Sequence, residues 1–369
     1  MKIKPFQAVY PNFDFITSTD SFFANVKYDY PEYYESGFFK KTSQEAIYIY
    51  RITTQKHSFT GIIACSDLQD YYDGKIKKHE NTLSSKEQLQ MQLMIRRGAM
   101  VKPVLLTYQD VKEVNTWIRK HIKKNKCFFE AHFEKEDQTH SFWEVSDGKA
   151  IQTVQTLFDQ NVAESYIADG HHRTSTSALL YERLQHKEQD KKYDQLLSAY
   201  FPVSELEVHD YNRIVEGLNE CSLTTFMAKM SKLFDFEILE EGRKPTEKHE
   251  IVMYLNREWF ALRWKKSVLK SYKHLKVILD ASMLDEKVLK DIIGIEDIRT
   301  DLRIKYVDGT KGVEEVRTKT IKNENRIAFL LYPVKLEELI AVADANMIMP
   351  PKSTWFEPRM RNGLLVQEY

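Results

Sequence analysis

The sequence is poor in the residues that mark several distinctive classes of protein. Its 369 residues include only 12 Gly, 10 Pro and 3 Cys. So little glycine and proline excludes collagen-like and low-complexity chains. The cysteines are far apart and form no CxxC pair, so we expect reduced thiols in a cytoplasmic protein, without a disulfide framework or a zinc site; they are Cys65, Cys127 and Cys221.

An excess of charge is also missing. Lys plus Arg and Asp plus Glu both number 54, so no overall field draws the chain to nucleic acid or to an anionic membrane. No apolar run reaches the roughly 18 residues that a membrane span needs, and the first residues lack the apolar segment of a signal peptide. We expect a soluble, cytoplasmic protein with no membrane or nucleic-acid partner, and we leave its oligomeric state open.

Three widespread active-site motifs are absent. The chain has no GxxxxGK followed by Ser or Thr, no GxGxxG after a strand and no GxSxG. P-loop nucleotide hydrolases, Rossmann dehydrogenases and the common serine hydrolases therefore lack support. Most histidines are scattered without the spacing of metal ligands, so no transition-metal site is expected.

Helices and β-hairpins alternate along the chain, and 42% of its residues are hydrophobic, enough for sizeable cores. Recurring hairpins argue against a purely parallel sheet and predict an α+β fold with mixed sheets. We expect two lobes, residues 1–215 and a smaller α+β lobe at 216–369. The clearest predicted elements are hairpins at 45–66, 127–145 and 250–264, helices at 84–97, 111–124, 224–233, 284–293 and 335–343, and strands at 166–168, 234–239, 302–307 and 326–332.

The most informative segment is Tyr166–Leu179. It reads as a strand that breaks at Gly170, followed by His171, His172 and Arg173 and by a helix that opens at Thr174. Unpaired N–H groups at a helix start, beside cationic side chains, form a phosphate site. Asp169, at the strand end, would suit a Mg²⁺ ligand or a base. The alternative is a polar turn whose histidines only cap the helix.

A second cluster, 74–82, precedes the predicted helix at 84. Here Glu80 beside His79 could act as a general base for an alcohol or water nucleophile. The alternative is a charged loop that caps the helix.

Two further clusters lie nearer the C-terminus. Prolines in 349–359 stiffen the backbone around Lys352 and Ser353, which could reach a terminal phosphate. The alternative is a structural tail that docks its aromatic side chains. After a predicted strand, Asn212 and Arg213 could bind a carboxylate or a phosphate, unless they form an ordinary loop.

These clusters resemble the family known as domain of unknown function 1015. The two most specific pieces are Ala-Asp-Gly-His-His-Arg at 168–173 and Met-Pro-Pro-Lys-Ser-Thr-Trp-Phe-Glu-Pro at 349–358. Matching pieces occur along the whole chain; they include Lys4-Pro5-Phe6, Tyr72–Thr82, His140-x-x-Trp143 and Tyr211-Asn212-Arg213.

The central turn is also similar to the phosphate-binding turn of the ParB/sulfiredoxin superfamily, which implies a nucleotide-binding core in the first lobe. Sulfiredoxins have Gly-Cys-His-Arg, in which the Cys attacks the substrate. His171 stands at the position of that Cys, so sulfinic acid reduction is not expected. The Asp169-Gly170-His171 turn resembles that of kinases acting on free L-serine, in which a glutamate accepts the hydroxyl proton. Glu80 is the candidate for that role.

We therefore predict a phosphotransferase that acts on a small hydroxyl metabolite, first of all free L-serine. It would use ATP or ADP, with CTP as an alternative, and Mg²⁺ bound by Asp169. Gly170 to Arg173, Lys352 and Ser353 would bind phosphates, while Asn212 and Arg213 would hold the substrate carboxylate. Glu80, oriented by His79, would accept the hydroxyl proton. The 349–359 tail would return to the site. The alternative functions are a ParB-like nucleotide-binding switch without kinase activity, or a scaffold that these clusters only stabilise.

Overall fold

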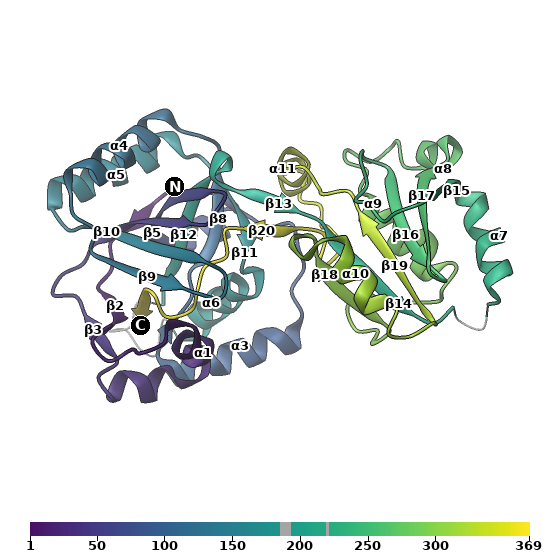
Figure 1. The fold of residues 1–369 in the computed structure, drawn as a ribbon. Helices are drawn as coiled ribbons and strands as arrows, with labels where there is room; N and C mark the ends of the chain where they lie inside the picture. Colours follow the sequence, from purple (N-terminus) through teal and green to yellow (C-terminus); the bar gives the residue numbers. More distant parts are fainter. Residues whose placement is uncertain (185–192, 219–220) are drawn as a thin grey trace. The chain divides into compact units, whose positions relative to one another are not determined.

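The computed structural model describes residues 1–184, 193–218 and 221–369. It consists of two compact units (Figure 1). The first unit comprises Met1–Leu206 and Pro358–Tyr369, and the second comprises Glu207–Glu357. Both contain helices and mixed or antiparallel sheets, so the predicted α+β class is confirmed. Among the described residues, no helix is long and apolar enough to span a membrane.

A large mixed sheet forms the centre of the first unit. The β6–β11 and β8–β12 pairs are parallel, while the other pairs are antiparallel. A short strand, β1 (Ile3–Lys4), pairs with β5 outside the main order. That order is β6 (Ile76–Lys77), β11 (Ser165–Asp169), β8 (Val104–Tyr108), β12 (Gln195–Pro202), β5 (Ser58–Asp67), β4 (Ile47–Thr53), β10 (Gln138–Val145) and β9 (Phe129–Phe133).

Two predicted hairpins appear within this sheet. Thr53 pairs with Ser58 at the closed end of β4–β5, and Gln138 pairs with Phe133 at that of β10–β9. The inner strands β8 and β12 are buried along their whole length and mostly apolar, as expected for strands covered on both sides. Gly61 allows close packing here, since a Cβ at this position would lie 2.4 Å from the carbonyl oxygen of Tyr200.

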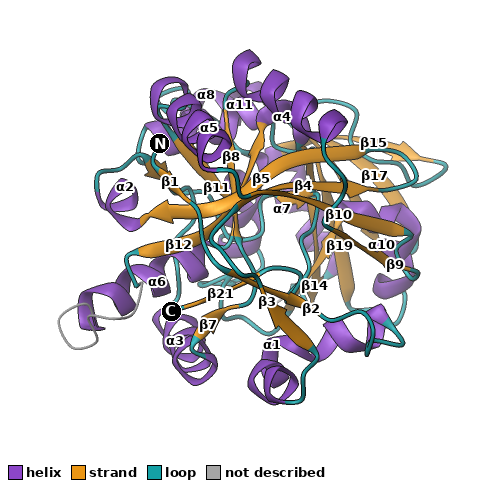
Figure 2. Ribbon diagram, turned by 90° about the vertical axis from the view of Figure 1, so that its left-hand side faces the viewer, coloured by secondary structure: helices purple, strands orange, loops and turns teal. Residues whose placement is uncertain are grey.

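Helices cover both faces of the large sheet. In Figures 1 and 2, α4 (Lys112–Lys124) and α5 (Gly148–Asn161) lie on one face, and α3 (Ser84–Arg97) and α6 (His171–Leu184) on the other. The α3 and α6 helices pack through Met91, Met94 and Leu180. The predicted end of α3 at Gly98 is confirmed, with φ of +58° at that glycine. The sequence predicts that α6 continues to His186, which lies outside the described residues.

The remainder of the first unit includes α2 (Leu68–Tyr72) and α1 (Thr19–Glu35), whose kink at Asp29 precedes Pro31. A small antiparallel sheet joins the two ends of the chain, because the C-terminal strand lies between an N-terminal one and β7. Its order is β3 (Phe39–Lys41), β2 (Ala8–Pro11), β21 (Val366–Glu368) and β7 (Ala99–Met100).

The second unit is built on an antiparallel sheet with apolar clusters on both faces. The predicted hairpin at 250–264 is confirmed, and Asn256 and Arg257 at its turn both have positive φ. Its strand order is β15 (Phe234–Leu239), β17 (Glu258–Trp264), β16 (Glu250–Leu255), β19 (Arg326–Leu331), β14 (Tyr211–Glu216) and β18 (Ile304–Asp308).

Two of the three helices predicted in the second unit are confirmed, those at 224–233 and 335–343, whereas the helices Lys266–Ser271 and Gly312–Thr320 were not predicted. At 284–293 the structure differs, because α9 ends at Leu284 and a π-helical turn, Asp285–Lys290, follows. A two-stranded ribbon pairs β13 (Glu207–His209) with β20 (Trp355–Glu357). The helices are α7 (Leu223–Leu233), α8 (Lys266–Ser271), α9 (Asp280–Leu284), α10 (Gly312–Thr320) and α11 (Leu336–Asp344).

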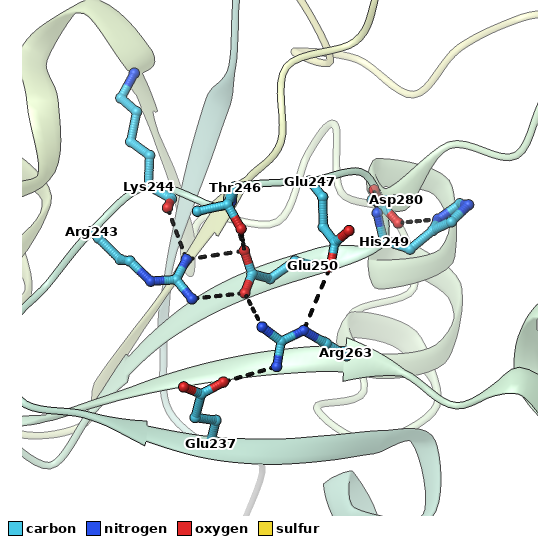
Figure 3. Close-up of polar contacts among 9 residues, drawn as sticks. All are labelled: Glu237, Arg243, Lys244, Thr246, Glu247, His249, Glu250, Arg263 and Asp280. Carbon is cyan, nitrogen blue, oxygen red and sulfur yellow. Dashed lines mark hydrogen bonds and ion pairs between the residues drawn. The ribbon is translucent and has the colours of Figure 1, made fainter.

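A buried carboxylate stabilises one end of the β16–β17 hairpin (Figure 3). Glu250 is fully buried and accepts two hydrogen bonds from Arg243, at 2.8 and 3.0 Å. The backbone N–H and the hydroxyl of Thr246 also donate to it, at 2.6 and 2.9 Å. These donors, with the Arg243 hydrogen bonds contributing most, lower the pKa of Glu250 to about 2.

Arg263 extends this network toward the surface. Its Nη2 donates to Glu250 at 3.2 Å, while Nη1 binds Glu237 at 2.8 Å and Nε lies 3.7 Å from Glu247. Two arginines thus share three carboxylates. We call Glu250, Arg243, Thr246, Arg263, Glu237 and Glu247 the Glu250 cluster.

Candidate functional site

The turn between β11 and α6 is set by one glycine. Gly170 has φ of +109°, and a Cβ there would lie 2.7 Å from Nη2 of Arg173. The helix starts directly after it, at His171, and the Thr174 N–H already donates to the Gly170 carbonyl. The prediction that the helix opens at Thr174 is therefore wrong, since the first turn contains both histidines and Arg173. Its leading N–H groups have no partner within the helix.

His171 and His79 form a buried pair. Their ring centroids are 4.5 Å apart at 81°, and the backbone N–H of His79 donates to Nε2 of His171 at 3.5 Å. Burial lowers the pKa of His79 to about 3 and that of His171 well below its usual value. Both rings are therefore neutral near pH 7. Because Nε2 of His171 accepts a hydrogen bond, its Nδ1 carries the proton.

One cavity of about 340 Å³ lies between the start of α3 and α6. It is lined by Glu80, from the loop before α3, and by His171, from the first turn of α6. The structure thus brings together two predicted site residues that are 91 positions apart. We call it the Glu80 cavity; its other lining residues include Tyr71, Tyr72, Lys78, Thr82, Glu87 and Ser175.

Glu87 is a lining residue that sequence reasoning did not identify. Its position, three residues after Ser84, matches a capping box. In the structure Leu83 occupies the cap position, and the Glu87 carboxylate instead accepts from Thr82 Oγ1 at 2.5 Å and Ser175 Oγ at 2.7 Å. The Thr82 hydrogen bond is the largest cause that lowers its pKa. Only the packing of α6 beside α3 reveals this role.

Asp169 lies among three cations. Its Oδ2 accepts from Arg173 Nη2 at 2.9 Å and lies 3.7 Å from Lys102 Nζ, and its Oδ1 accepts from Arg359 at 3.2 Å. Although burial opposes ionisation, these cations hold the pKa of Asp169 well below its usual value. Burial also lowers the pKa of Lys102 to about 8. We call these four residues the Asp169 cluster.

The Asp169 cluster does not fit the predicted Mg²⁺ site. Three positive side chains around one carboxylate would repel a divalent cation. Within residues 1–184, 193–218 and 221–369, no three His, Cys, Asp or Glu side chains gather as metal ligands do. Asp169 instead orients Arg173.

Arg173 and His171 point to different cavities. Arg173 lines a second cavity of about 220 Å³, together with Lys27, Arg97 and Lys102. We call it the cationic cavity, and it shares no lining residue with the Glu80 cavity. His172 is half-buried and is not among the residues that line either one. The expectation that residues 170–173 surround one phosphate therefore gains no support from these side chains.

Asn212 and Arg213 lie inside the second unit. Arg213 is fully buried, and its guanidinium binds Asp285 at 3.0 and 3.4 Å and the Tyr211 carbonyl at 3.1 Å. Asn212 Oδ1 accepts from the Leu331 N–H at 3.1 Å. These contacts account for both side chains without a ligand, so we leave them out of the proposed site.

Lys352 and Ser353 also belong to the second unit. Lys352 has φ of +57°, and its Nζ lies 5.2 Å from the ring centroid of Tyr211. The Ser353 hydroxyl donates to the Pro350 carbonyl at 2.7 Å. Their predicted action on a phosphate held by the first unit stays a prediction.

Comparison with known proteins identifies the family. Residues 9–285 match the family described as "Protein of unknown function (DUF1015)". The chain belongs to this family. The membership predicted from the motifs is thereby confirmed, whereas the ParB/sulfiredoxin likeness stays a prediction.

No curated protein matches the chain. Solved structures resemble it only distantly. They include "SbnI with C-terminal truncation from Staphylococcus aureus", 12% identical over 83% of this chain and 87% of that one, with a TM-score of 0.44. A "Free serine kinase in complex with AMP" is 14% identical over 82% and 92%, with a TM-score of 0.39. A "Conserved hypothetical protein from Pyrococcus furiosus" is 15% identical over 83% and 95%, with a TM-score of 0.40.

Proposed function

We propose that this protein is a nucleotide-dependent phosphotransferase that acts on the hydroxyl group of a small metabolite. One observation carries the proposal: a single cavity is lined both by Glu80 and by the first residue of α6, His171. A carboxylate can accept a proton, and a helix N-terminus favours a phosphate. Their presence in one cavity is what transfer from a nucleotide to an alcohol requires.

In this proposal the N–H groups at the start of α6 bind the transferring phosphoryl group. His171, which is neutral, adds a hydrogen-bond donor through Nδ1. Glu80 takes the proton from the acceptor hydroxyl as its oxygen forms a bond to phosphorus, and the bond from phosphorus to the nucleotide oxygen breaks. The shortened nucleotide leaves with that oxygen. Positioning and fixed donors supply most of the rate in such a reaction.

The acceptor and donor follow from the size of the cavity and from the sequence. At about 340 Å³ the Glu80 cavity is near the lower end of the usual range for ligand sites, which favours a small acceptor. The Asp169-Gly170-His171 turn resembles that of kinases that phosphorylate free L-serine, so L-serine is the first acceptor to test. ATP and ADP are the donors. No step is assigned to Mg²⁺ at Asp169, because the cluster around it does not fit a metal.

The test is transfer of labelled phosphate from ATP or ADP to L-serine, then to pooled hydroxy metabolites. Glu80→Gln should lower kcat by about 10²- to 10⁴-fold and leave nucleotide affinity unchanged, because a general base contributes that much. Glu182→Gln is the matched control, since Glu182 lines the same cavity and bonds Tyr72.

Two outcomes would overturn the proposal. One is the absence of transfer to any acceptor from either nucleotide. The other is equal activity of the Glu80→Gln variant and the unaltered protein. If the unaltered protein and the Glu80→Gln variant both bind a nucleotide but neither transfers phosphate, the nucleotide-binding switch is favoured instead.

A further inference from the structure

The cationic cavity is separate from the Glu80 cavity, although residues of α3 and α6 line both. Its residues come from α1, α3, β7 and the segment that follows β7, α6 and the C-terminal segment. Four carry a positive charge and none carries a negative one; the full lining is Lys27, Gln90, Arg97, Met100, Val101, Lys102, Arg173 and Asn362.

The charge of this cavity is only partly compensated. Asp169 lies outside the lining and is shared by Arg173, Lys102 and Arg359. Arg97 is 8% exposed, and its hydrogen bonds go to the carbonyls of Leu93 and Lys27, which carry no charge. Burying like charges together costs free energy unless an anion compensates them. Among the residues that the structure describes, the lining of this cavity therefore has an excess of positive charge.

We propose that the cationic cavity is a binding site for a small phosphoryl-type anion. Arginine presents a planar fork that matches phosphate oxygens, and lysine adds a point charge. Gln90 and Asn362 offer amide donors on the same lining. The volume of about 220 Å³ lies below the usual range for drug-sized ligands, so the cavity suits inorganic phosphate better than a whole nucleotide. This site does not depend on the proposed phosphotransfer, because the two cavities share no residue.

Calorimetric titration of the full chain with inorganic phosphate tests this site. Gln90→Glu places an isosteric carboxylate on the cavity, where it would pair with the cations and repel phosphate; we expect at least tenfold weaker binding, a loss of about 1.4 kcal/mol or more. Gln92→Glu makes the same change at an exposed position of α3 and should leave the affinity within about twofold, as distant surface charges are screened. Lys27→Gln, at a half-buried position, provides a second variant and should also weaken binding.

Four results would overturn the inference. The first three are the absence of binding heat with phosphate, equal phosphate binding to the Gln90→Glu and Gln92→Glu variants, and replacement of phosphate by chloride at the same ionic strength. Competition between phosphate and ADP in the unaltered protein would also overturn a separate site, because it would assign the cavity to the phosphates of a nucleotide. Unchanged phosphate binding in Glu80→Gln would support it whether or not that variant is active.

Discussion

Both units contain a carboxylate held by several cations, but the two clusters differ in charge balance. In the Glu250 cluster, two arginines face three carboxylates, and the central Glu250 is fully buried (Figure 3). In the Asp169 cluster, three cations surround one carboxylate that remains 29% exposed. In the Glu250 cluster each charged side chain is paired with another of the same cluster, whereas the Asp169 cluster has an excess of positive charge beside a cavity.

This difference separates a structural cluster from a candidate binding site. Both carboxylate oxygens of Glu250 accept hydrogen bonds from residues of the same unit. The cluster therefore needs no ligand to satisfy its hydrogen bonds. Two members of the Asp169 cluster, Lys102 and Arg173, also line the cationic cavity. A perturbed pKa occurs in both clusters and does not by itself indicate function. The feature that points to a binding site is the unbalanced positive charge beside a cavity.

The largest effect is expected from Glu250→Gln. Removing this carboxylate leaves Arg243 without its buried partner, and breaking a buried ion pair in this way typically costs about 3–5 kcal/mol. Urea unfolding, followed by circular dichroism, measures the change. Glu247→Gln is the control, because Glu247 is 67% exposed and its ion pair should contribute less than about 1 kcal/mol. Equal losses of unfolding free energy in Glu250→Gln and Glu247→Gln would contradict the expectation that the buried carboxylate of the Glu250 cluster contributes more than an exposed one.

The pH dependence of the same cluster should be smaller. The pKa of Glu250 is about 2 in the folded protein, below its usual value of 4.5. Its ionisation therefore adds stability above about pH 4.5, and this contribution is lost as the pH falls toward 2. The stability difference between the unaltered protein and Glu250→Gln should shrink by about 2 kcal/mol between about pH 5 and pH 2.5. A constant difference over this range would contradict the lowered pKa.

The smallest effect is expected from Asp169→Asn. Asp169 is 29% exposed, whereas Glu250 is fully buried, so we expect a smaller loss of about 1–2 kcal/mol in the free energy of unfolding. Inorganic phosphate should then stabilise this variant more than the unaltered protein, because more positive charge is left uncompensated. Thermal unfolding with and without phosphate measures both changes. A loss as large as that of Glu250→Gln, or equal stabilisation by phosphate, would mean that the two clusters are alike.

Local patterns in the sequence predicted most of the secondary structure. The hairpin at 250–264 and the end of α3 at Gly98 follow from turn residues and glycine, whose effects are local. The predicted start of α6, Thr174, is three residues too late. The positive φ of Gly170 ends the strand, and the helix begins at His171 without a Ser or Thr cap. The long α1 helix escaped prediction, since Pro31 interrupts its pattern.

The site was less predictable because its contacts join distant residues. The motifs indicated Glu80 and His171, which share a cavity. They did not indicate that Lys102 and Arg359 would surround Asp169, or that Arg213 would be fully buried against Asp285. A motif shows which residue types are present, whereas the charges that reach them from other elements depend on the tertiary fold.

The first turn of α6 contributes side chains to both cavities and could couple ligand binding in one to ligand binding in the other. Within three residues it places His171 on one cavity and Arg173 on the other. An anion that drew the guanidinium of Arg173 away from Asp169 would act on the same helical turn that carries His171, which lies at the proposed nucleotide site. Since linkage between two sites is reciprocal, any change in nucleotide affinity caused by the anion must be matched by an equal change in anion affinity caused by the nucleotide. The affinity of either cavity for its ligand, measured with and without the other ligand, would then show whether the two sites are coupled.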